Sequence, residues 1–334
     1  MTVLGAPDLA DDLVRLGVRE GDCLMVHGSM RAIGPAIGGA RSVIEALIEA
    51  VGAPGTLVMP AYTRDALLPP GTAGVPPKIL AEIEAQVPGF EPQTSSCHQL
   101  GALAEAFRTW PGVLRSRHPV HSMTALGPEA RRIVSHHPRD WAFGLDGPMG
   151  RLVETGRARV LMLGVGWDRC SALHTAETIA RFRRLRVLRF KDTTREVARW
   201  IHARDVTEDA EGLFPRLGAA IDAAELSLQG WIGLAEARLV DLDDMLAFAA
   251  PWIASYVSAD AAATRGIEGA ALGEKPARRR RRGPAARRSL VDDSDPDPAG
   301  PGGGGGGGGE GAGAFSVGPS PRRGRGSPKR RARR

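Results

Sequence analysis

The sequence predicts an α/β fold, in which helices cover both faces of a mixed β-sheet in a three-layer sandwich. Short apolar runs typical of buried strands alternate with amphipathic helical patterns over residues 1–260. Hydrophobic residues make up 43% of the 334 residues and charged residues 25%, so the chain can bury a sizeable core. We find no internal repeat, and one or two domains are the expected organisation.

Each expected element follows from local spacing. Leu9, Leu13 and Leu16 recur at helical intervals, and a turn at Gly21 precedes the apolar run that follows. The strongest helical period lies between the Gly-rich segments that flank residues 40–51. In chain order we expect a helix at 8–16, a strand at 23–26, a helix at 40–51, a strand at 56–59, helices at 100–108 and 128–135, a strand at 160–165, a helix at about 173–185, a strand at 237–240 and a helix at 242–250.

The end of the chain has a different composition. Residues 272–334 hold 16 of the 44 Lys and Arg residues and 6 of the 38 Asp and Glu residues, so the formal charge of +6 conceals a net charge of −4 in residues 1–271. Eight consecutive glycines occupy 302–309, and few large apolar residues are present to offset the entropy of ordering this segment. We expect a folded domain over residues 1–263 and a disordered, basic, Gly-rich tail over 264–334.

The lengths of the apolar runs and the spacing of the cysteines indicate the cellular compartment of the protein. No run of about 18 apolar residues is present, and the first residues lack the pattern of a signal peptide, so neither a membrane span nor secretion is expected. Cys23, Cys97 and Cys170 are widely spaced and form no CxxC pair, which suits a reducing compartment and excludes a Cys-based zinc site. We therefore expect a cytoplasmic protein.

The first chemical motif is a Gly-containing loop between a strand and a helix. Ser29, Met30 and Arg31 follow the strand expected at 23–26, and Gly38-Gly39 opens the helix at 40–51. Backbone N–H groups at a helix start bind anions, so this arrangement suits a phosphate-bearing cofactor. It lacks the GK[ST] of a P-loop and the dinucleotide GxGxxG. An ordinary turn that needs Gly at positive φ is the alternative.

The second motif gathers polar residues over 115–127, a segment expected to be a loop followed by a strand. It contains His118, His121 and Ser122 with two arginines. The spacing of the two histidines would allow a metal site, but no third ligand lies at matching spacing, so the sequence does not favour zinc.

The third motif follows the strand expected at 160–165, where a sheet edge commonly forms a ligand crevice. His174 and Glu177 are three apart and share a helix face, which is the arrangement of a general base with an orienting carboxylate. Cys170 lies four residues before His174, a spacing that would also allow a thiolate relay. The structural alternative is a helix capped by Ser171 with Glu177 exposed.

Taken in order, these motifs resemble the aminoglycoside 3-N-acetyltransferase family, which is distinct from the common acetyltransferase fold. The resemblance covers residues 9–252. It rests on short motifs distributed along the chain: Gly21-Asp22, His27-Gly28-Ser29-Met30-Arg31-x-x-Gly34, Gly55-Thr56-Leu57-Val58-Met59-Pro60, Gly101-Ala102-Leu103-Ala104-Glu105, Arg115-Ser116 with His118-Pro119 and Ser122, Phe143-Gly144, Leu163-Gly164-Val165-Gly166, Leu173-His174 with Ala176-Glu177, and Ala237-Arg238-Leu239.

The resemblance implies acetyl-CoA as the acetyl donor and an aminoglycoside as the acceptor. It implies catalysis by His174 with Glu177 and Ser171, and no metal. It implies cofactor binding by Ser29, Met30, Arg31, Gly38, Gly39 and Ser122.

The chain departs from the family pattern at Ser171, at His121 and at Met123-Thr124. The arginine-rich segment 181–199 also matches poorly, which leaves the identity of the acceptor open.

Acidic residues follow that segment. A polycationic acceptor needs carboxylates, and Asp205, Glu208, Asp209 and Glu211 form a cluster in a domain that is net negative. We expect the acceptor at Tyr62, His118, Asp205, Glu208 and Asp209, while a solvated acidic loop before a helix at about residue 213 is the alternative.

Two competing functions remain open at this stage. The first is a CoA-dependent acyltransferase that acts on another amine in a biosynthetic pathway. The second is nucleic-acid binding through the basic tail, which we expect to be non-specific at most. Acetylation that survives truncation at about residue 272 would exclude the tail as the functional element.

Overall fold

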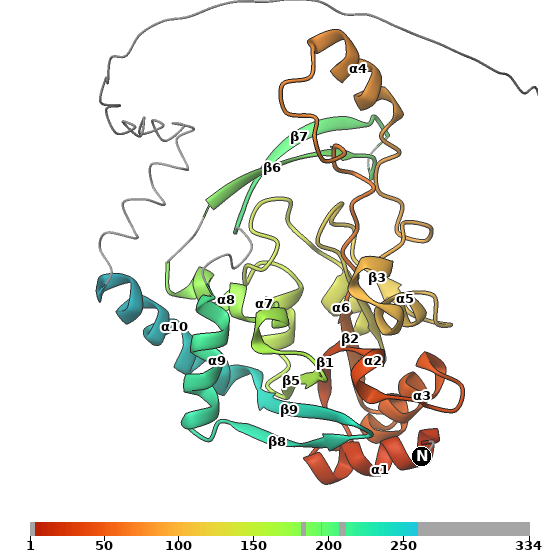
Figure 1. The fold of residues 1–334 in the computed structure, drawn as a ribbon, viewed down its shortest axis with the longest axis vertical. Helices are drawn as coiled ribbons and strands as arrows, with labels where there is room; N and C mark the ends of the chain where they lie inside the picture. The colour runs from red at the N-terminus through yellow and green to blue at the C-terminus, as the bar shows by residue number, and fades with distance from the viewer. Residues whose placement is uncertain (1–3, 182–184, 195, 207–211, 260–334) are drawn as a thin grey trace, which may run out of the picture. The chain divides into compact units, whose positions relative to one another are not determined.

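The computed structural model describes residues 4–181, 185–194, 196–206 and 212–259 (Figure 1). In this part of the chain a seven-stranded sheet has the order β3-β4-β2-β1-β5-β9-β8. Its centre is parallel and its flanks are antiparallel, so the sheet is mixed, as expected. The strands are β1 (Cys23–Gly28), β2 (Thr56–Pro60), β3 (Leu114–Arg115), β4 (Met123–Leu126), β5 (Ala158–Leu163), β8 (Ser227–Ile232) and β9 (Ala235–Asp241).

Alternating side chains of the central strands build two cores. In β1, Cys23 and Met25 enter one hydrophobic cluster and Leu24 and Val26 the other, because successive strand residues point to opposite faces. The second cluster is covered by α1 (Ala6–Leu16), α3 (Ala40–Val51) and α5 (Ala102–Arg108). The first is covered by α6 (Ala130–Val134), α7 (Pro148–Val153), α8 (Leu173–Ile179), α9 (Leu213–Ala223) and α10 (Leu242–Ala259). The three-layer sandwich is confirmed.

Most expected elements are confirmed within a few residues of their ends. The helix expected at 40–51 is α3, which begins after Gly39 and ends at Gly52, two glycines with φ of 62° and 63°. The helix expected at 100–108 is a 3₁₀ turn (His98–Leu100) followed by α5, and that at 128–135 is the shorter α6. Two further short helical segments are α2 (Met30–Ile33), which follows β1, and the 3₁₀ turn Trp167–Arg169, which follows β5.

The helix expected at 173–185 is wrong at its C-terminal end. The helix α8 ends at Ile179, and Leu185 opens a strand, β6 (Leu185–Asp192), which pairs antiparallel with β7 (Arg199–Val206). The reason is an alternation of buried and exposed side chains with a period of two residues, which the arginines of the segment obscure. Phe190 and Asp192 are buried, whereas Val187 is exposed between half-buried neighbours. Figure 1 shows this ribbon beside α4 (Pro77–Gln86), a helix that the sequence did not lead us to expect.

The ribbon is attached to the domain by a small core of its own. Phe190 and Ala203 pack with Ala66, Phe90 and Val120. Residues 260–334, which include the expected domain boundary at 263 and the basic tail, lie outside the described residues. In the ranges that are described, no helix is both long and apolar enough to cross a membrane.

Candidate active site

Three loops meet at the carboxyl edge of the parallel strands. β1 lies between β2 and β5, and its last residue, Gly28, is opposite Leu163, the last residue of β5. The backbone N–H of Ser29 donates to the carbonyl of Leu163 at 2.9 Å, which joins the two loops at their start. Ligands of α/β proteins commonly bind at this edge, and the polar motifs of the sequence follow these strands.

His174 and Glu177 form a close pair on α8. His174 Nδ1 lies 2.7 Å from Glu177 Oε2, and their side chains are 16% and 0% exposed. The alternative reading of this segment, a capped helix with Glu177 exposed to solvent, is therefore wrong for Glu177. The carboxylate fixes the ring orientation, and Nε2 has no hydrogen-bond partner among the described residues. This arrangement leaves one imidazole nitrogen free to accept a proton.

Aromatic rings enclose the imidazole of His174. The ring of Phe143 lies 4.9 Å from it, and that of Phe214 lies 4.8 Å from it, measured between centroids. Neither residue was a site candidate, because a lone Phe gives no sequence signal of chemistry. The two rings cover part of the imidazole and leave its side chain 16% exposed, while the carboxylate of Glu177 is fully buried.

Tyr62 and Ser171 are brought together from distant parts of the chain. The Tyr62 hydroxyl donates to Ser171 Oγ at 2.7 Å. Burial raises the pKa of Tyr62, so the phenol remains a donor at neutral pH. Ser171 does not cap α8, whose N-cap residue is Ala172. Because Tyr62 supplies this hydrogen bond, the hydrogen of the Ser171 hydroxyl is available for another acceptor.

Cys170 is unsuited to a covalent relay. It is 1% exposed, and burial raises the pKa of its thiol to about 12. The thiolate is the nucleophilic form, and it is scarce at neutral pH in such surroundings.

The candidate histidine His118 is fully buried and both of its nitrogens are in use. Its Nδ1 accepts the backbone N–H groups of Val120 and His121 at 3.1 and 2.9 Å, and its Nε2 donates to the Arg139 carbonyl at 3.2 Å. Burial lowers its pKa well below the ordinary value. The ring therefore shapes the loop and has no free nitrogen for an acceptor. Within the described ranges, no group of three or more His, Cys, Asp or Glu side chains is arranged to hold a metal ion.

The expected acidic cluster is only partly described. Asp205 lies on β7 and is 1% exposed, with Oδ2 2.7 Å from His121 Nδ1. Its carboxylate therefore faces a histidine and not solvent. Glu208, Asp209 and Glu211 lie outside the described residues.

The expected cofactor loop follows β1 directly. Ser29 and Met30 are half-buried and Arg31 is exposed. Gly38 and Gly39 have φ of 83° and 62°, and a Cβ at Gly39 would meet nothing within 4 Å, so the chain there faces open space. The first turn of α3 carries no acidic residue. A negatively charged group fits this helix start, because its backbone N–H groups point outward and no carboxylate repels it.

Two further polar side chains lie beneath these loops. The hydroxyl of Ser122 is fully buried, donates to the Ala61 carbonyl at 2.7 Å and accepts from Arg115 Nε at 2.9 Å. Ser122 thus ties the loop after β2 to β4. His27, at the end of β1, has a buried Nε2 with no hydrogen-bond partner among the described residues, and burial lowers its pKa to about 4. The sequence placed His27 in a family motif but gave it no role, and the structure shows that its uncharged ring lies at this edge with a buried Nε2.

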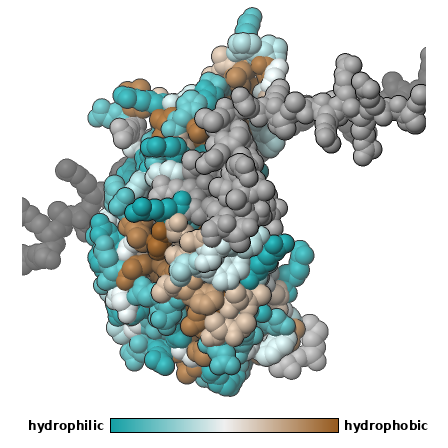
Figure 2. Space-filling model, turned by 90° about the vertical axis from the view of Figure 1, so that its left-hand side faces the viewer, coloured by the Kyte–Doolittle hydropathy of each residue, from teal (hydrophilic) through white to brown (hydrophobic). Residues whose placement is uncertain are grey.

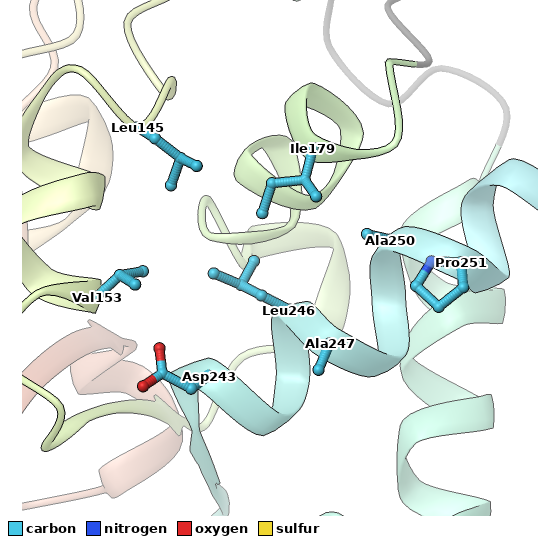
Figure 3. Close-up of a pocket in the computed structure, with 8 residues that line it drawn as sticks. All are labelled: Leu145, Val153, Ile179, Asp243, Leu246, Ala247, Ala250 and Pro251. Carbon is cyan, nitrogen blue, oxygen red and sulfur yellow. The ribbon is translucent and has the colours of Figure 1, made fainter.

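Two pockets among the described residues lie apart from this pair, since neither His174 nor Glu177 lines them. One of about 360 Å³ lies among α7, α8 and α10 and is apolar except for Asp243 (Figure 3). Figure 2 views the side where α8 and α10 lie in Figure 1, and it shows hydrophobic surface among hydrophilic residues there. A larger one, of about 760 Å³, lies between α4 and the segment that starts at Arg64, two residues after Tyr62. The site is therefore defined by its side-chain cluster.

Known proteins resemble this chain over most of its described length. A family model described as aminoglycoside 3-N-acetyltransferase matches residues 25–254. Aminoglycoside N(3)-acetyltransferase IX of Micromonospora chalcea is 35% identical over 258 residues, which cover 72% of this chain and 90% of that protein. The solved structure of AAC-IIIb in a binary complex with CoASH superposes with a TM-score of 0.69 at 32% identity, covering 76% and 98% of the two chains. AAC-VIa bound to sisomicin superposes with a TM-score of 0.68 at 32% identity, covering 76% and 99%.

Proposed function

The chain belongs to the aminoglycoside 3-N-acetyltransferase family, and on this premise we propose that it transfers the acetyl group of acetyl-CoA to the 3-amino group of a 2-deoxystreptamine aminoglycoside. Such a transfer would inactivate the antibiotic. The observation that carries the proposal is the pair formed by His174 and the fully buried Glu177, 2.7 Å apart. The CoASH complex of one relative and the sisomicin complex of another support the two classes of substrate.

His174 acts as the general base in this proposal. Its Nε2 takes a proton from the ammonium of the acceptor, while Glu177 holds the ring by Nδ1 and stabilises the imidazolium that forms. The neutral amine forms the C–N bond at the thioester carbonyl, the C–S bond breaks, and the CoA thiolate leaves with the proton that the imidazolium returns, while the second proton of the nitrogen goes to solvent. Direct attack by the neutral amine needs no covalent relay, which agrees with the protonated thiol of Cys170.

Ser171 supports the oxygen on which negative charge develops. Tyr62 donates to Ser171 Oγ, so the remaining hydroxyl hydrogen is free to donate to that oxygen. Ser171 thus supplies a hydroxyl donor at one of the positions where the chain departs from the family pattern.

Acetyl-CoA supplies the activated thioester, and the chain binds it at the helix start described above. We assign its phosphates and pantetheine to Ser29, Met30 and Arg31 with Gly38 and Gly39, because the N–H groups of α3 and an exposed guanidinium attract anions. The hydroxyl of Ser122 is engaged within the protein, so its part is to hold the Ala61 loop from beneath.

The acceptor side is proposed at Tyr62 and the acidic residues Glu208 and Asp209, since a polycation binds where carboxylates gather. We further propose that residues 1–263 form the catalytic domain, that residues 264–334 are an appendage, and that the enzyme works in the cytoplasm, where free cysteines such as the buried Cys23, Cys97 and Cys170 remain reduced.

A thiol-release assay with acetyl-CoA and a panel of aminoglycosides, sisomicin among them, tests the function, with the acetylated nitrogen identified by NMR. His174→Ala should lower kcat by about 10²–10⁴-fold, because the lost role is proton abstraction. Its affinity for CoA, measured by calorimetry, should stay nearly unchanged. His136→Ala is the matched control, since His136 is exposed. Retention of most of the kcat by His174→Ala would refute the general base, and turnover of other amines alone would redirect the acceptor.

A further inference from the structure

A second imidazole–carboxylate pair lies close to the proposed base. His121 Nδ1 is 2.7 Å from Asp205 Oδ2, and the two side chains are 9% and 1% exposed. The ring of Phe143 contacts both histidines, with centroid distances of 5.2 Å to His121 and 4.9 Å to His174. This second pair has no part in the chemistry proposed above.

The β6–β7 ribbon holds the carboxylate of this pair in place. Asp205 is the cross-strand partner of Arg186. The preceding residue, Arg204, is fastened by both of its backbone groups: its N–H donates to Asp140 Oδ1 at 2.6 Å, and its carbonyl accepts from the N–H of Trp141 at 2.8 Å. The position of Asp205 is therefore set by backbone hydrogen bonds on either side of the strand.

Two charged side chains lie against the nitrogens of His121, and the close contact with Asp205 is an ion pair outside hydrogen-bond geometry. Nδ1 faces the carboxylate of Asp205, and Arg186 Nη2 lies 3.5 Å from Nε2. A guanidinium can only donate, so this arrangement assigns the ring hydrogen to Nδ1 and makes Nε2 the acceptor. Nε2 of His121 therefore faces a guanidinium, and Nδ1 faces the carboxylate of Asp205.

The ring of His121 reaches the catalytic residues by packing. It meets Tyr62 edge to face, with centroids 5.3 Å apart and planes at 78°, and it also contacts Phe143. Tyr62 in turn donates to Ser171, and Phe143 packs on His174. Edge-to-face contacts between aromatic rings have a preferred geometry, so a ring fixed at one end constrains its neighbours.

We propose that Asp205 is a positioning residue: it fixes the orientation of His121, which sets Tyr62 and Phe143 against Ser171 and His174. The inference rests on the proposed function for its kinetic readout only. It assigns Asp205 a role in turnover, in place of the direct contact with the acceptor that the acidic cluster of the sequence led us to expect.

A double-mutant cycle on the full chain tests this role. The variants are Asp205→Asn, His121→Phe and the two combined, and the last leaves no unpaired carboxylate buried. Each single variant should lower kcat about tenfold, with the KM for sisomicin and for acetyl-CoA unchanged within twofold. The double variant should lose no more than either single one, because both changes break the same link. Asp11→Asn and His136→Phe alter exposed residues and serve as controls.

Several outcomes would overturn the proposal. Losses that multiply to about a hundredfold in the double variant would show that the two residues act independently. A tenfold rise in the KM for sisomicin at constant kcat would make Asp205 an acceptor contact. Unchanged kcat in both single variants would remove any role. Calorimetric CoA binding reports whether each variant folds, and His121→Asn, which retains an N–H, replaces His121→Phe in the cycle if the latter does not fold.

A spectroscopic readout separates this inference from the proposed function. In ¹H–¹⁵N spectra of the wild type, His121 should carry its hydrogen on Nδ1, and Asp205→Ala should abolish that signature. The signature is expected even if the wild type does not acetylate sisomicin, a result that would sink the proposed function alone. A wild-type His121 that carries its hydrogen on Nε2 would overturn the pairing itself.

Discussion

Lowering the pH from 7.5 to 5.5 should destabilise the fold through its buried histidines. Burial lowers the pKa of His27 to about 4 and that of His137 to about 3, and it lowers that of His118 well below 6.5. The unfolded chain protonates these rings below pH 6.5, whereas the folded chain does so only at much lower pH. Stability that is present above pH 6.5 is therefore lost as the pH falls toward the folded-state pKa values.

The size of the loss follows from the same pKa values. The unfolded ring, with a pKa of about 6.5, takes up a proton between pH 7.5 and 5.5, whereas the buried ring stays neutral. Each buried ring therefore lowers the free energy of unfolding by about 1.4 kcal/mol at pH 5.5, which corresponds to the one pH unit below the pKa of the unfolded ring. His27 and His137 together contribute about 3 kcal/mol, and His118 adds a loss of the same sign. Aspartate and glutamate side chains with ordinary pKa values are ionised in both states throughout this range, so they do not mask the effect.

Urea unfolding followed by tryptophan fluorescence at pH 7.5, 6.5 and 5.5 measures this loss. His27→Met removes one buried titrating ring and should reduce the loss by about 1.4 kcal/mol. His136→Ala removes an exposed ring and should leave the pH dependence as it is. A free energy of unfolding that stays constant down to pH 5.5, or an equal effect of the two substitutions, would refute the reasoning.

Three further predictions concern turnover. Glu177→Gln should lower kcat by about 10–100-fold, since a hydrogen bond to a charged group is worth about 1.5–3 kcal/mol. The control Glu49→Gln changes an exposed residue and should leave kcat unchanged. Equal kcat values for the two variants would contradict the role of the pair. Cys170→Ala should keep the kcat of the wild type, and a trapped acetyl-Cys170 that passes its acyl group to sisomicin would reverse this prediction. Gly39→Val should raise the KM for acetyl-CoA by about tenfold with little change in the KM for sisomicin. The reason is that a φ of 62° disfavours a β-branched residue at the start of α3. An unchanged KM for acetyl-CoA would show that the cofactor binds elsewhere.

Local patterns were sufficient to predict the central sheet and its covering helices. The helix α3 and the strands β1 and β2 each have an unbroken hydrophobic period and a glycine beside them, and the structure has them where the sequence placed them. The pair of His174 and Glu177 was also predictable, since their spacing of three residues on a helix brings the side chains together whatever the rest of the chain does.

The β6–β7 ribbon was not predicted, because the positions of its arginines obscure the alternation of its buried residues. Between 185 and 206 the arginines occupy both faces, so the alternation around Phe190 is read only once its buried neighbours are known. The error at the end of α8 came from the same segment. The helix expected to extend to residue 185 ends at Ile179, and Leu185 begins the strand β6. Phe190 of that strand packs with Ala66 and Phe90, which lie far earlier in the chain, so no local pattern predicts the change.

The candidate site depends on contacts between residues that are far apart in the sequence. Tyr62 and Ser171 are 109 residues apart, and no local pattern relates them, because their hydrogen bond exists only when β2 and β5 end at the same edge of the sheet. The contact between His121 and Asp205 depends in addition on the register of the ribbon, which places Asp205 opposite Arg186. A slip of one residue in that register would turn Asp205 to the other face. The pair of His174 and Glu177, which we propose as the base, is thus determined locally, whereas the orientation of the residues around it depends on strand pairings that only the folded chain establishes.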